Sequence, residues 1–324
     1  MTLGVVIPCY RQERFLPRTV AALERALAGR EWRGVLVLSA PGPEGPPADL
    51  SPHWRVLRPA AARPLTPGAA RNAGLAACGG TWVLFVDADV EVDAAWIARA
   101  LELADADPAV AGAWGRLEEW FVDGAAERPG SPDLYRVGDA DHDSDYLATL
   151  ALYRRSALER AGAYEPRLNS EEDFELGLRL RARGFRLRSL APRAAKHWSA
   201  PRPSFAEIGR RWRTGLCFGQ GQVLRLYLGR PGLGAHLERQ ALYLVVLAMW
   251  LAAVPALALA GGRGLAAWAL APLLLLAVMA ARKRSPRLAL HSLLTWTVNA
   301  AGMAVGFVRG GAPPPPATGS ESPC

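Results

Sequence analysis

The sequence predicts an α/β fold in about the first two hundred residues, followed by C-terminal transmembrane helices. Short apolar runs such as LGVVIP and TWVLFV alternate with stretches of helical periodicity, which is typical of layered α/β folds. About the last ninety residues are instead dominated by Leu, Ala, Val and Trp, and their charges form short clusters. We therefore expect a catalytic domain at 1–202, an interfacial juxtamembrane segment with an amphipathic helix at 203–239, a transmembrane region at 240–308 and a Pro-rich tail at 309–324.

The elements of the N-terminal region follow one another in a regular order. Short apolar runs that end at Pro, Gly or acidic residues predict strands buried in a parallel sheet, at 3–8, 34–39, 54–58 and 81–86. A helical pattern begins at Pro17, since proline is tolerated in the first turn. Thr66 before Pro67 marks a second helix start, and Asp93 caps a third helix that runs to about residue 105. This alternation predicts an α/β sheet covered by helices.

Four acids follow the strand 81–86 at every second position: Asp87, Asp89, Glu91 and Asp93. If the strand continued, they would lie on one face about 7 Å apart, in residue types that are poor in strands. Ligands of α/β sheets bind at the carboxyl ends of the strands. There, two carboxylates can converge on Mg²⁺ or Mn²⁺ that carries a substrate phosphate. The spacing alone leaves both interpretations open.

Four segments resemble the family 2 glycosyltransferases and occur in the family's order: VVIPCYRQERFL, ARNAGLAACGGTWVLFVDADV, LYRRSALERAGAYEPRL and SEEDFELGLRLRARGFRL. The resemblance covers roughly residues 3–198. It implies a GT-A fold, which is a Rossmann-like domain that binds nucleotide-diphospho-sugars. It also implies an inverting transfer assisted by a divalent cation, Mn²⁺ or Mg²⁺. It names neither the sugar nor the acceptor.

The resemblance implies metal ligands after the strand 81–86. Asp87 and Asp89 match the D-x-D element that bridges the donor diphosphate through the cation, and Asp89 is the expected direct ligand. Glu91 is then part of a solvated loop. His197 falls where relatives carry a histidine near the metal or the diphosphate, although a structural role beside Trp198 is equally open.

A second acidic pair, Glu172 and Asp173, matches the family's E-D motif. The resemblance assigns Asp173 as the general base that takes the proton from the acceptor hydroxyl. The residues themselves offer another interpretation, because Ser170 followed by Asp173 resembles a capping box at a helix start. Both roles are compatible.

The nucleotide-sugar site implied by the resemblance takes residues from the first two of these segments: Pro8, Tyr10, Glu13, Arg71, Asn72 and Asp87. The sequence departs from the family at two places. Arg11 stands where Asn is usual, and Ser39-Ala40-Pro41 replaces the Asp that reads the base after the second strand. A UDP-sugar is therefore a preference and not a deduction.

Three apolar segments are long enough to cross a bilayer, at 241–260, 264–281 and 288–308, and none contains a charged residue. Basic residues precede the first segment and fill the loop before the third: Arg225, Arg230, Arg239, Arg282, Lys283, Arg284 and Arg287. The positive-inside rule then places the N-terminal domain in the cytoplasm. We expect a multi-pass protein of the inner (cytoplasmic) membrane whose Pro-rich tail is disordered and lies outside.

The partners follow from charge and from the resemblance. The net charge of +8 would permit nucleic acid, but much of the excess lies near the apolar segments, where it fits anionic headgroups. We expect a nucleotide-sugar donor, a lipid or envelope-glycan acceptor at the membrane, and no nucleic acid. Two alternatives stay open. One is a membrane-tethered, inactive nucleotide-binding or scaffold protein, and the other is a nucleotidyltransferase with the same fold.

Overall fold

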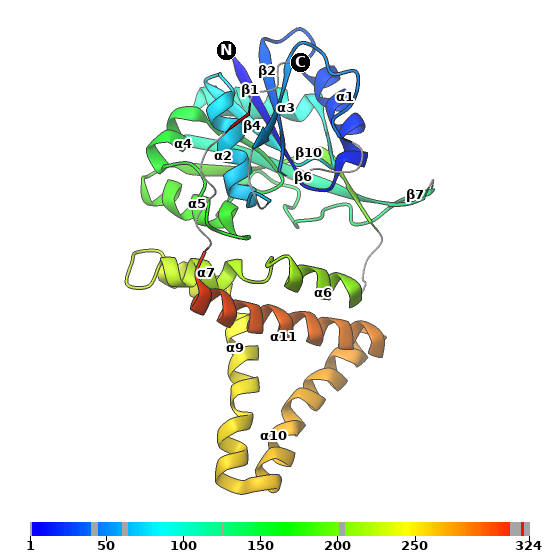
Figure 1. Cartoon of the computed structure of the whole chain (residues 1–324), viewed down its shortest axis with the longest axis vertical. Helices are drawn as coiled ribbons and strands as arrows, with labels where there is room; N and C mark the ends of the chain where they lie inside the picture. Colours follow the sequence, from blue (N-terminus) through cyan, green and yellow to red (C-terminus); the bar gives the residue numbers. More distant parts are fainter. Residues whose placement is uncertain are drawn as a thin grey trace. The chain divides into compact units, whose positions relative to one another are not determined.

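The computed structural model describes residues 2–39, 45–59, 64–124, 126–200, 205–311 and 319–320 (Figure 1). The chain forms two compact units. Unit 1 contains residues 1–168, 172–201 and 312–324, and unit 2 contains residues 169–171 and 202–311. Each unit is described by itself below.

Unit 1 is built around one mixed β-sheet. In spatial order its main strands are β3 (Trp54–Pro59), β2 (Trp32–Leu38), β1 (Leu3–Cys9), β4 (Trp82–Val86), β9 (Leu150–Arg154), β6 (Val110–Asp123), β10 (Arg186–Ser199) and β5 (Val90–Val92). The strands β3, β2, β1 and β4 run parallel, whereas β9 is antiparallel to both β4 and β6. Three short strands pair at the margins: β7 (Ala126–Pro129), β8 (His142–Asp143) and β11 (Gly319–Ser320). The predicted α/β fold class is confirmed.

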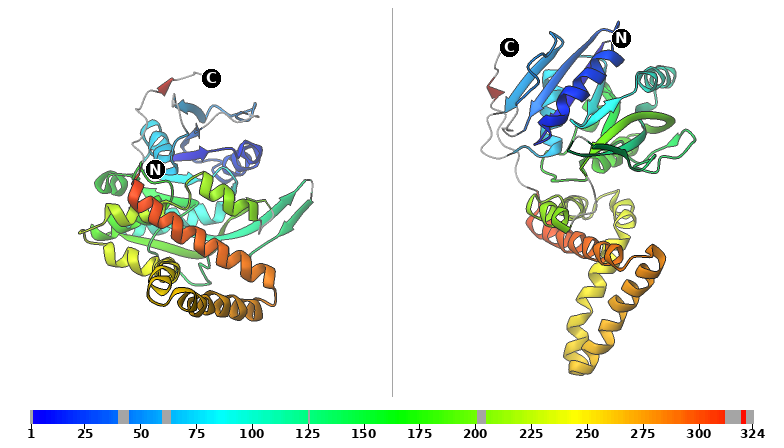
Figure 2. Two further views of the ribbon diagram at one scale, coloured as in Figure 1. Left: turned by 60° about the horizontal axis from the view of Figure 1, so that its bottom comes forward. Right: turned by 90° about the vertical axis from the view of Figure 1, so that its right-hand side faces the viewer.

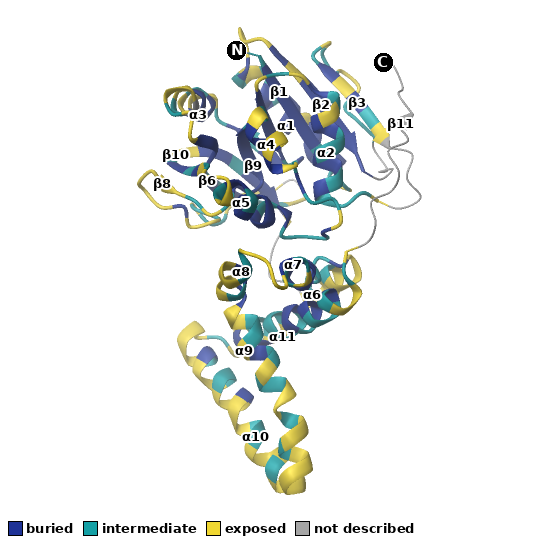
Figure 3. Ribbon diagram, turned by 90° about the vertical axis from the view of Figure 1, so that its left-hand side faces the viewer, coloured by how far each residue is buried: buried dark blue, intermediate teal, exposed yellow. Residues whose placement is uncertain are grey.

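Helices cover both faces of this sheet. The 3₁₀ turn η1 (Glu13–Phe15) leads into α1 (Leu16–Ala26), which packs with α3 (Ala94–Ala106) on one face. The other face carries α2 (Pro67–Ala77), α4 (Arg155–Ala161) and α5 (Glu172–Ala182). Successive side chains of β1 point to opposite faces, so Val5 and Ile7 join one core cluster and Val6 the other. The central strands are buried throughout (Figure 3).

Two of the expected helix caps are present. The hydroxyl of Thr66 accepts a hydrogen bond from the Ala69 amide at 3.2 Å, and the Asp93 carboxylate accepts one from the Ala95 amide at 3.0 Å. Both helices therefore begin where the sequence predicts, because each side chain satisfies an amide that the first turn leaves unpaired.

One local prediction is wrong. Glu91 lies in strand β5 rather than in a solvated loop, because β10 runs antiparallel beside it and Trp198 Nε1 donates to its carboxylate at 2.9 Å. The capping box of Ser170 and Asp173 stays a prediction. The Ser170 hydroxyl also donates to the Leu216 carbonyl at 2.9 Å, within unit 2.

Unit 2 consists of helices: α6 (Phe205–Arg213), α7 (Gly219–Leu226), α8 (Leu233–Arg239), α9 (Ala241–Leu251), α10 (Ala253–Lys283) and α11 (Pro286–Arg309). The predicted segments 241–260 and 264–281 lie in one helical stretch, 241–283, that is broken at Gly261 and folds into a hairpin (Figures 1 and 2). Within the described residues, this stretch and α11 are long and apolar enough to cross a membrane. Except at Gly319–Ser320, the tail beyond residue 311 lies outside the described residues.

Glycines let the helices of unit 2 approach closely. A Cβ atom at Gly302 would meet the Cys217 backbone and side chain at about 2.5 Å, and one at Gly306 would meet the Phe218 carbonyl at 2.0 Å. This G-x-x-x-G spacing puts both glycines on the face of α11 that packs against the start of α7. The segment 169–171 is also part of this unit, since Asn169 exchanges hydrogen bonds with the Gln222 amide at 2.7 and 2.9 Å.

Replacing Gly74 tests the packing of α2 on β1. A Cβ at this position would lie 2.3 Å from Val6 Cγ1 in the middle of the sheet. We expect Gly74→Ala to lower the free energy of unfolding by about 1–3 kcal/mol through overpacking. Thermal melting in detergent measures the effect, with Gly79→Ala as the control because no atom lies within 4 Å of its new Cβ. Equal melting of the two variants would contradict this account.

Candidate active site

A buried arginine joins two acidic loops of unit 1. Arg71 lies in α2 and is 5% exposed. Its Nη1 donates to Oε1 of Glu172 at 2.6 Å, and its Nη2 donates to Oδ1 of Asp87 at 2.9 Å. The planar guanidinium presents its N–H donors in a fixed geometry, so its two terminal nitrogens can bind two carboxylates at once. The end of β4 and the start of α5 are thereby held together.

The charge state of Arg71 is fixed by its neighbours. Burial by itself lowers the pKa of the guanidinium, but the carboxylates of Asp173, Asp87 and Glu172 outweigh it and hold that pKa well above its usual value. The side chain also lies against the Tyr164 ring, 5.4 Å from its centroid. The cation is thus permanent, and it offsets the repulsion among three acids.

The predicted acids of α5 differ in their contacts. The Glu172 side chain is 8% exposed and bonded to Arg71, whereas Asp173 Oδ1 lies 3.8 Å from Arg71 Nη1 and its side chain is 19% exposed. Asp173 is therefore the more accessible of the two. This difference agrees with the roles that the resemblance implies, in which the aspartate meets the acceptor.

Asn72 has a structural role in this conformation. Its amide donates to the Tyr164 carbonyl at 2.8 Å and accepts from the Tyr164 backbone amide at 3.0 Å. Both ends of the side chain are engaged by the loop that carries the ring beneath Arg71. The structure therefore brings Asn72 to the site through Tyr164, and its predicted contact with the donor stays a prediction.

Asp89 lies at the centre of a second buried group. Its Oδ2 accepts a hydrogen bond from Gln12 Nε2, and its Oδ1 faces His197 Nε2 at 3.6 Å. The opposite ring nitrogen of His197 lies 3.0 Å from the Ser199 hydroxyl, which fixes the orientation of the imidazole. Burial raises the pKa of Asp89 to about 6; His197 lowers it, and Asp87 raises it further.

These residues fit a divalent cation. Asp89 Oδ1 is buried and accepts no hydrogen bond from any of the described residues, and a carboxylate oxygen in that state is costly unless it binds a cation or a proton. Asp89 and His197 supply the oxygen and nitrogen donors that Mn²⁺ accepts. Asp87, the third predicted ligand, is directed to Arg71 instead. Among the described residues, no group of three or more His, Cys, Asp or Glu is arranged to hold a metal ion by itself.

The loop after β1 carries the remaining predicted residues. Pro8 lies within β1, and Tyr10 is half-buried, with the Arg11 guanidinium 5.3 Å from its ring. Arg11 has a positive φ of 56°, which is strained for a residue with a side chain. Glu13 is buried, and its Oε1 has no hydrogen-bond partner among the described residues. Of the three residues that replace the family's base-reading Asp, Ser39 is buried, and Ala40 and Pro41 lie outside the described residues.

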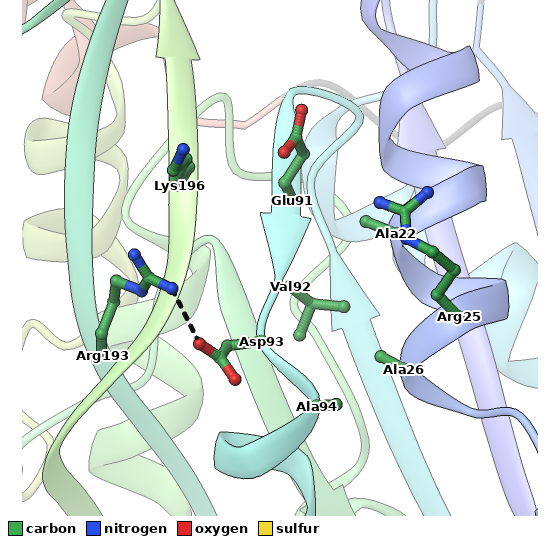
Figure 4. Close-up of a pocket in the computed structure, with 9 residues that line it drawn as sticks. All are labelled: Ala22, Arg25, Ala26, Glu91, Val92, Asp93, Ala94, Arg193 and Lys196. Atoms are coloured by element: carbon green, nitrogen blue, oxygen red, sulfur yellow. Dashed lines mark hydrogen bonds and ion pairs between the residues drawn. The ribbon is translucent and has the colours of Figure 1, made fainter.

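A separate cavity of about 370 Å³ lies between α1 and the paired strands β5 and β10 (Figure 4). It is lined by charges of both signs, including Arg25, Lys196 and the ion pair Arg193–Asp93 at 3.0 Å. None of the predicted catalytic, nucleotide-sugar or metal residues lines it. The candidate site is defined by the polar groups above and not by this cavity.

Sequence reasoning missed three residues of the site: Gln12, Tyr164 and Ser199. Gln12 occupies the loop whose neighbours Tyr10 and Glu13 were predicted, so its position after β1 was an available signal. Tyr164 and Ser199 act through contacts that only the folded chain provides. No spacing in the sequence connects Tyr164 with Arg71.

Known proteins resemble the chain in sequence and fold. Residues 4–162 match the family described as Glycosyl transferase family 2. The solved structures include a mannosyltransferase from Pyrobaculum calidifontis in complex with GDP-Man and Mn²⁺, with a TM-score of 0.56, 18% identity and coverage of 95% of this chain and 86% of that one. They also include residues 1–349 of TarS from S. aureus in complex with UDP-GlcNAc. For that structure the TM-score is 0.45 and the identity 16%, and the match covers 72% of this chain and 73% of that one. No curated protein matches the chain significantly.

Removal of the Arg71 cation tests the acidic bridge. Arg71→Met removes the partner of the buried Glu172 and of the half-buried Asp87, and breaking a buried pair costs about 3–5 kcal/mol. We expect the melting temperature to fall on the order of 10 °C. The control is Arg99→Met, whose ion pair with Asp141 is exposed and contributes at most about 1 kcal/mol. An Arg71→Met protein that melts like the control would refute the bridge.

The raised pKa of Asp89 predicts a pH-dependent stability without cations. The folded protein holds this proton up to about pH 6, above the ordinary value of 3.8, so stability falls as the pH rises between those values. At pH 7.5 in chelator, we expect the free energy of unfolding of Asp89→Asn to exceed that of the wild type by up to about 3 kcal/mol, so the variant melts at a higher temperature. The difference should vanish near pH 4. Adding Mn²⁺ should stabilise only the wild type. A less stable Asp89→Asn protein in chelator would contradict this assignment.

Proposed function

The chain carries a family 2 glycosyltransferase domain at residues 4–162, and from this premise we propose how it acts. The enzyme transfers a sugar from a nucleotide-diphosphate donor to a hydroxyl or phosphate of a membrane-proximal acceptor, by one displacement with inversion. The observation that carries the proposal is the Arg71 bridge. It links Asp87, at the carboxyl end of β4, to the pair Glu172 and Asp173.

Asp173 is the proposed general base. Glu172 is committed to Arg71 at 2.6 Å, so its lone pairs are directed to a permanent cation. Asp173 is farther from Arg71 and more exposed, which leaves it better able to accept a proton from an acceptor hydroxyl. Its position in the first turn of α5 gives it a rigid support. A single base of this kind favours direct attack on the anomeric carbon, opposite the departing diphosphate.

Asp89 and His197 are the proposed cation ligands, and Asp87 would lie near the diphosphate together with Arg71. Mn²⁺ or Mg²⁺ held there would neutralise charge on the departing diphosphate. The buried Oδ1 of Asp89 supports this assignment, because it accepts no hydrogen bond from the described residues and faces the second proposed ligand, His197 Nε2, at 3.6 Å. The Mn²⁺ bound by the mannosyltransferase of similar fold supports it as well.

The donor base remains a choice between uridine and guanosine. The family resemblance favours a UDP-sugar, whereas the mannosyltransferase of similar fold binds GDP-Man. Tyr10 and Glu13 lie in the loop after β1 and are proposed to contact the nucleotide. The acceptor is proposed to be a lipid carrier or an envelope glycan, because the apolar helices of unit 2 would keep the enzyme at the membrane.

A donor panel tests this function. Purified full-length protein is incubated with UDP-, GDP- and dTDP-sugars and Mn²⁺ or Mg²⁺, and nucleotide release is measured. We expect release that requires the cation and is lost in Asp89→Asn. Asp173→Asn should bind the donor with unchanged affinity and lose about 10²–10⁴-fold in turnover. Asp139→Asn is the matched control, because its side chain is 94% exposed.

Other outcomes point to the alternatives. Donor binding without turnover on any donor, in the presence of membrane lipid extracts as a source of acceptor, would indicate an inactive binding protein. Release of pyrophosphate from a nucleoside triphosphate and a sugar phosphate would indicate a nucleotidyltransferase. Asp173→Asn with wild-type turnover would remove the proposed base and leave the family assignment intact.

A further inference from the structure

The stretch 241–283 of unit 2 is a helical hairpin, so its last residues return to the level of its first residues. The stretch 241–283 reverses at Ala260 and Gly261, whose backbone angles are not helical, so it forms two legs of about 20 residues each. The legs are held together by Trp268 Nε1, which donates to the Met249 carbonyl at 2.7 Å, and by the rings of Trp250 and Trp268 at 5.4 Å. The two ends of the stretch therefore lie at the same end of the hairpin (Figure 2).

Both halves of α11 meet this same end. Its first residue follows the basic turn Arg282–Arg284, at the end of the second leg. Its C-terminal half reaches the start of the first leg, where Asn299 Nδ2 lies 3.4 Å from the Tyr243 hydroxyl. In Figure 1, α11 lies across the hairpin rather than beside it. A helix that crossed the bilayer would separate its two ends by the thickness of the hydrocarbon core.

The helices packed along α11 are too polar for the bilayer interior. The rings of Phe205 in α6 and His291 in α11 are 5.4 Å apart, and farther along α11, Gly306 abuts Phe218 at the start of α7. α6 and α7 thus follow α11 along most of its length. They carry Glu207, Arg210, Arg211, Arg213 and Arg225. If α11 spanned the bilayer, these charges would be carried through its interior, at several kcal/mol each.

We propose that α11 is an interfacial helix and that only the hairpin crosses the membrane. The proposal rests on the membrane attachment proposed above. The exposed face of α11, with Leu290, Leu294 and Val308, inserts at the boundary between lipid headgroups and acyl chains. Arg287 and Arg309, at the two ends of the helix, reach the headgroups. With two crossings, the tail lies on the same side as unit 1. This differs from the sequence prediction of three spans and an external tail.

The pairing of β11 with β3 supports the same topology. Gly319 and Ser320 pair antiparallel with Arg58 and Pro59 of unit 1. The chain therefore leaves unit 1 before residue 202 and rejoins it after residue 311. A protein cannot form one sheet from strands on opposite sides of a membrane. Unit 2 must cross an even number of times, which the hairpin alone provides.

Cysteine accessibility tests this topology in sealed vesicles of both orientations. Single cysteines replace Arg263 in the hairpin turn, Arg284 before α11 and Gly311 after it, in full-length Cys324→Ser protein; the remaining native cysteines are buried. A membrane-impermeant maleimide should label positions 284 and 311 from one side and position 263 from the other. Labelling of positions 263 and 311 from the same side, opposite 284, would overturn the proposal while keeping membrane attachment. Labelling of all three from one side would refute the membrane insertion itself.

A depth measurement provides an independent check. Spin labels at Leu290, Leu294 and Val308 on α11 are compared with labels at Leu265, Leu270 and Leu274 on the second leg, all exposed positions. Accessibility to oxygen and to a water-soluble nickel complex reports depth in the bilayer. We expect one shallow depth along α11 and a steep gradient along the second leg. Equal gradients in the two helices would overturn the interfacial placement.

Discussion

The candidate site depends on one buried cation. Arg71 is enclosed in the sheet's helical cover and holds Asp87 and Glu172 at hydrogen-bond distance, so acids from two distant segments lie close together around one guanidinium whose pKa is held well above its usual value. Without that charge, the buried carboxylate of Glu172 would lose the cation that offsets its desolvation. The same bond separates the roles of the acidic pair. Glu172 completes the bridge, and Asp173, whose side chain is 19% exposed, is the proposed general base.

Sequence reasoning reached the parts of this site that local patterns encode. The acids after TWVLFV lie at the end of a buried parallel strand, Thr66 and Asp93 cap their helices, and the acidic pair begins α5. It could not predict contacts between residues that are far apart in the sequence and meet only in the folded chain. Arg71 and Glu172 are 101 residues apart, and Gln12 and Asp89 are 77 apart. Glu91 was misread because its strand exists only where β10 returns beside it.

Hydropathy predicted which segments are long and apolar enough for a bilayer, but not whether each one crosses the bilayer or lies along its surface. It detected every apolar segment of unit 2, since the bilayer requirement is one of composition. Whether a helix crosses the bilayer or lies along it is decided by the helices beside it. Gly302 and Gly306 draw the polar helix α7 against α11, and Asn299 sits at Tyr243 near the first turn of α9. Those contacts, and not the mean hydropathy, carry the argument for an interfacial helix.

The central claim is that one base, Asp173, acts beside an arginine that has immobilised its neighbour. The proposed reaction is a single displacement, which reverses the configuration at the anomeric carbon. The most direct test is the configuration of the first-formed product, followed by ¹H NMR with an α-linked nucleotide sugar before the free sugar equilibrates. The account predicts the β-anomer. A product that forms with the α configuration would require a second nucleophile and would contradict the assignment of Asp173.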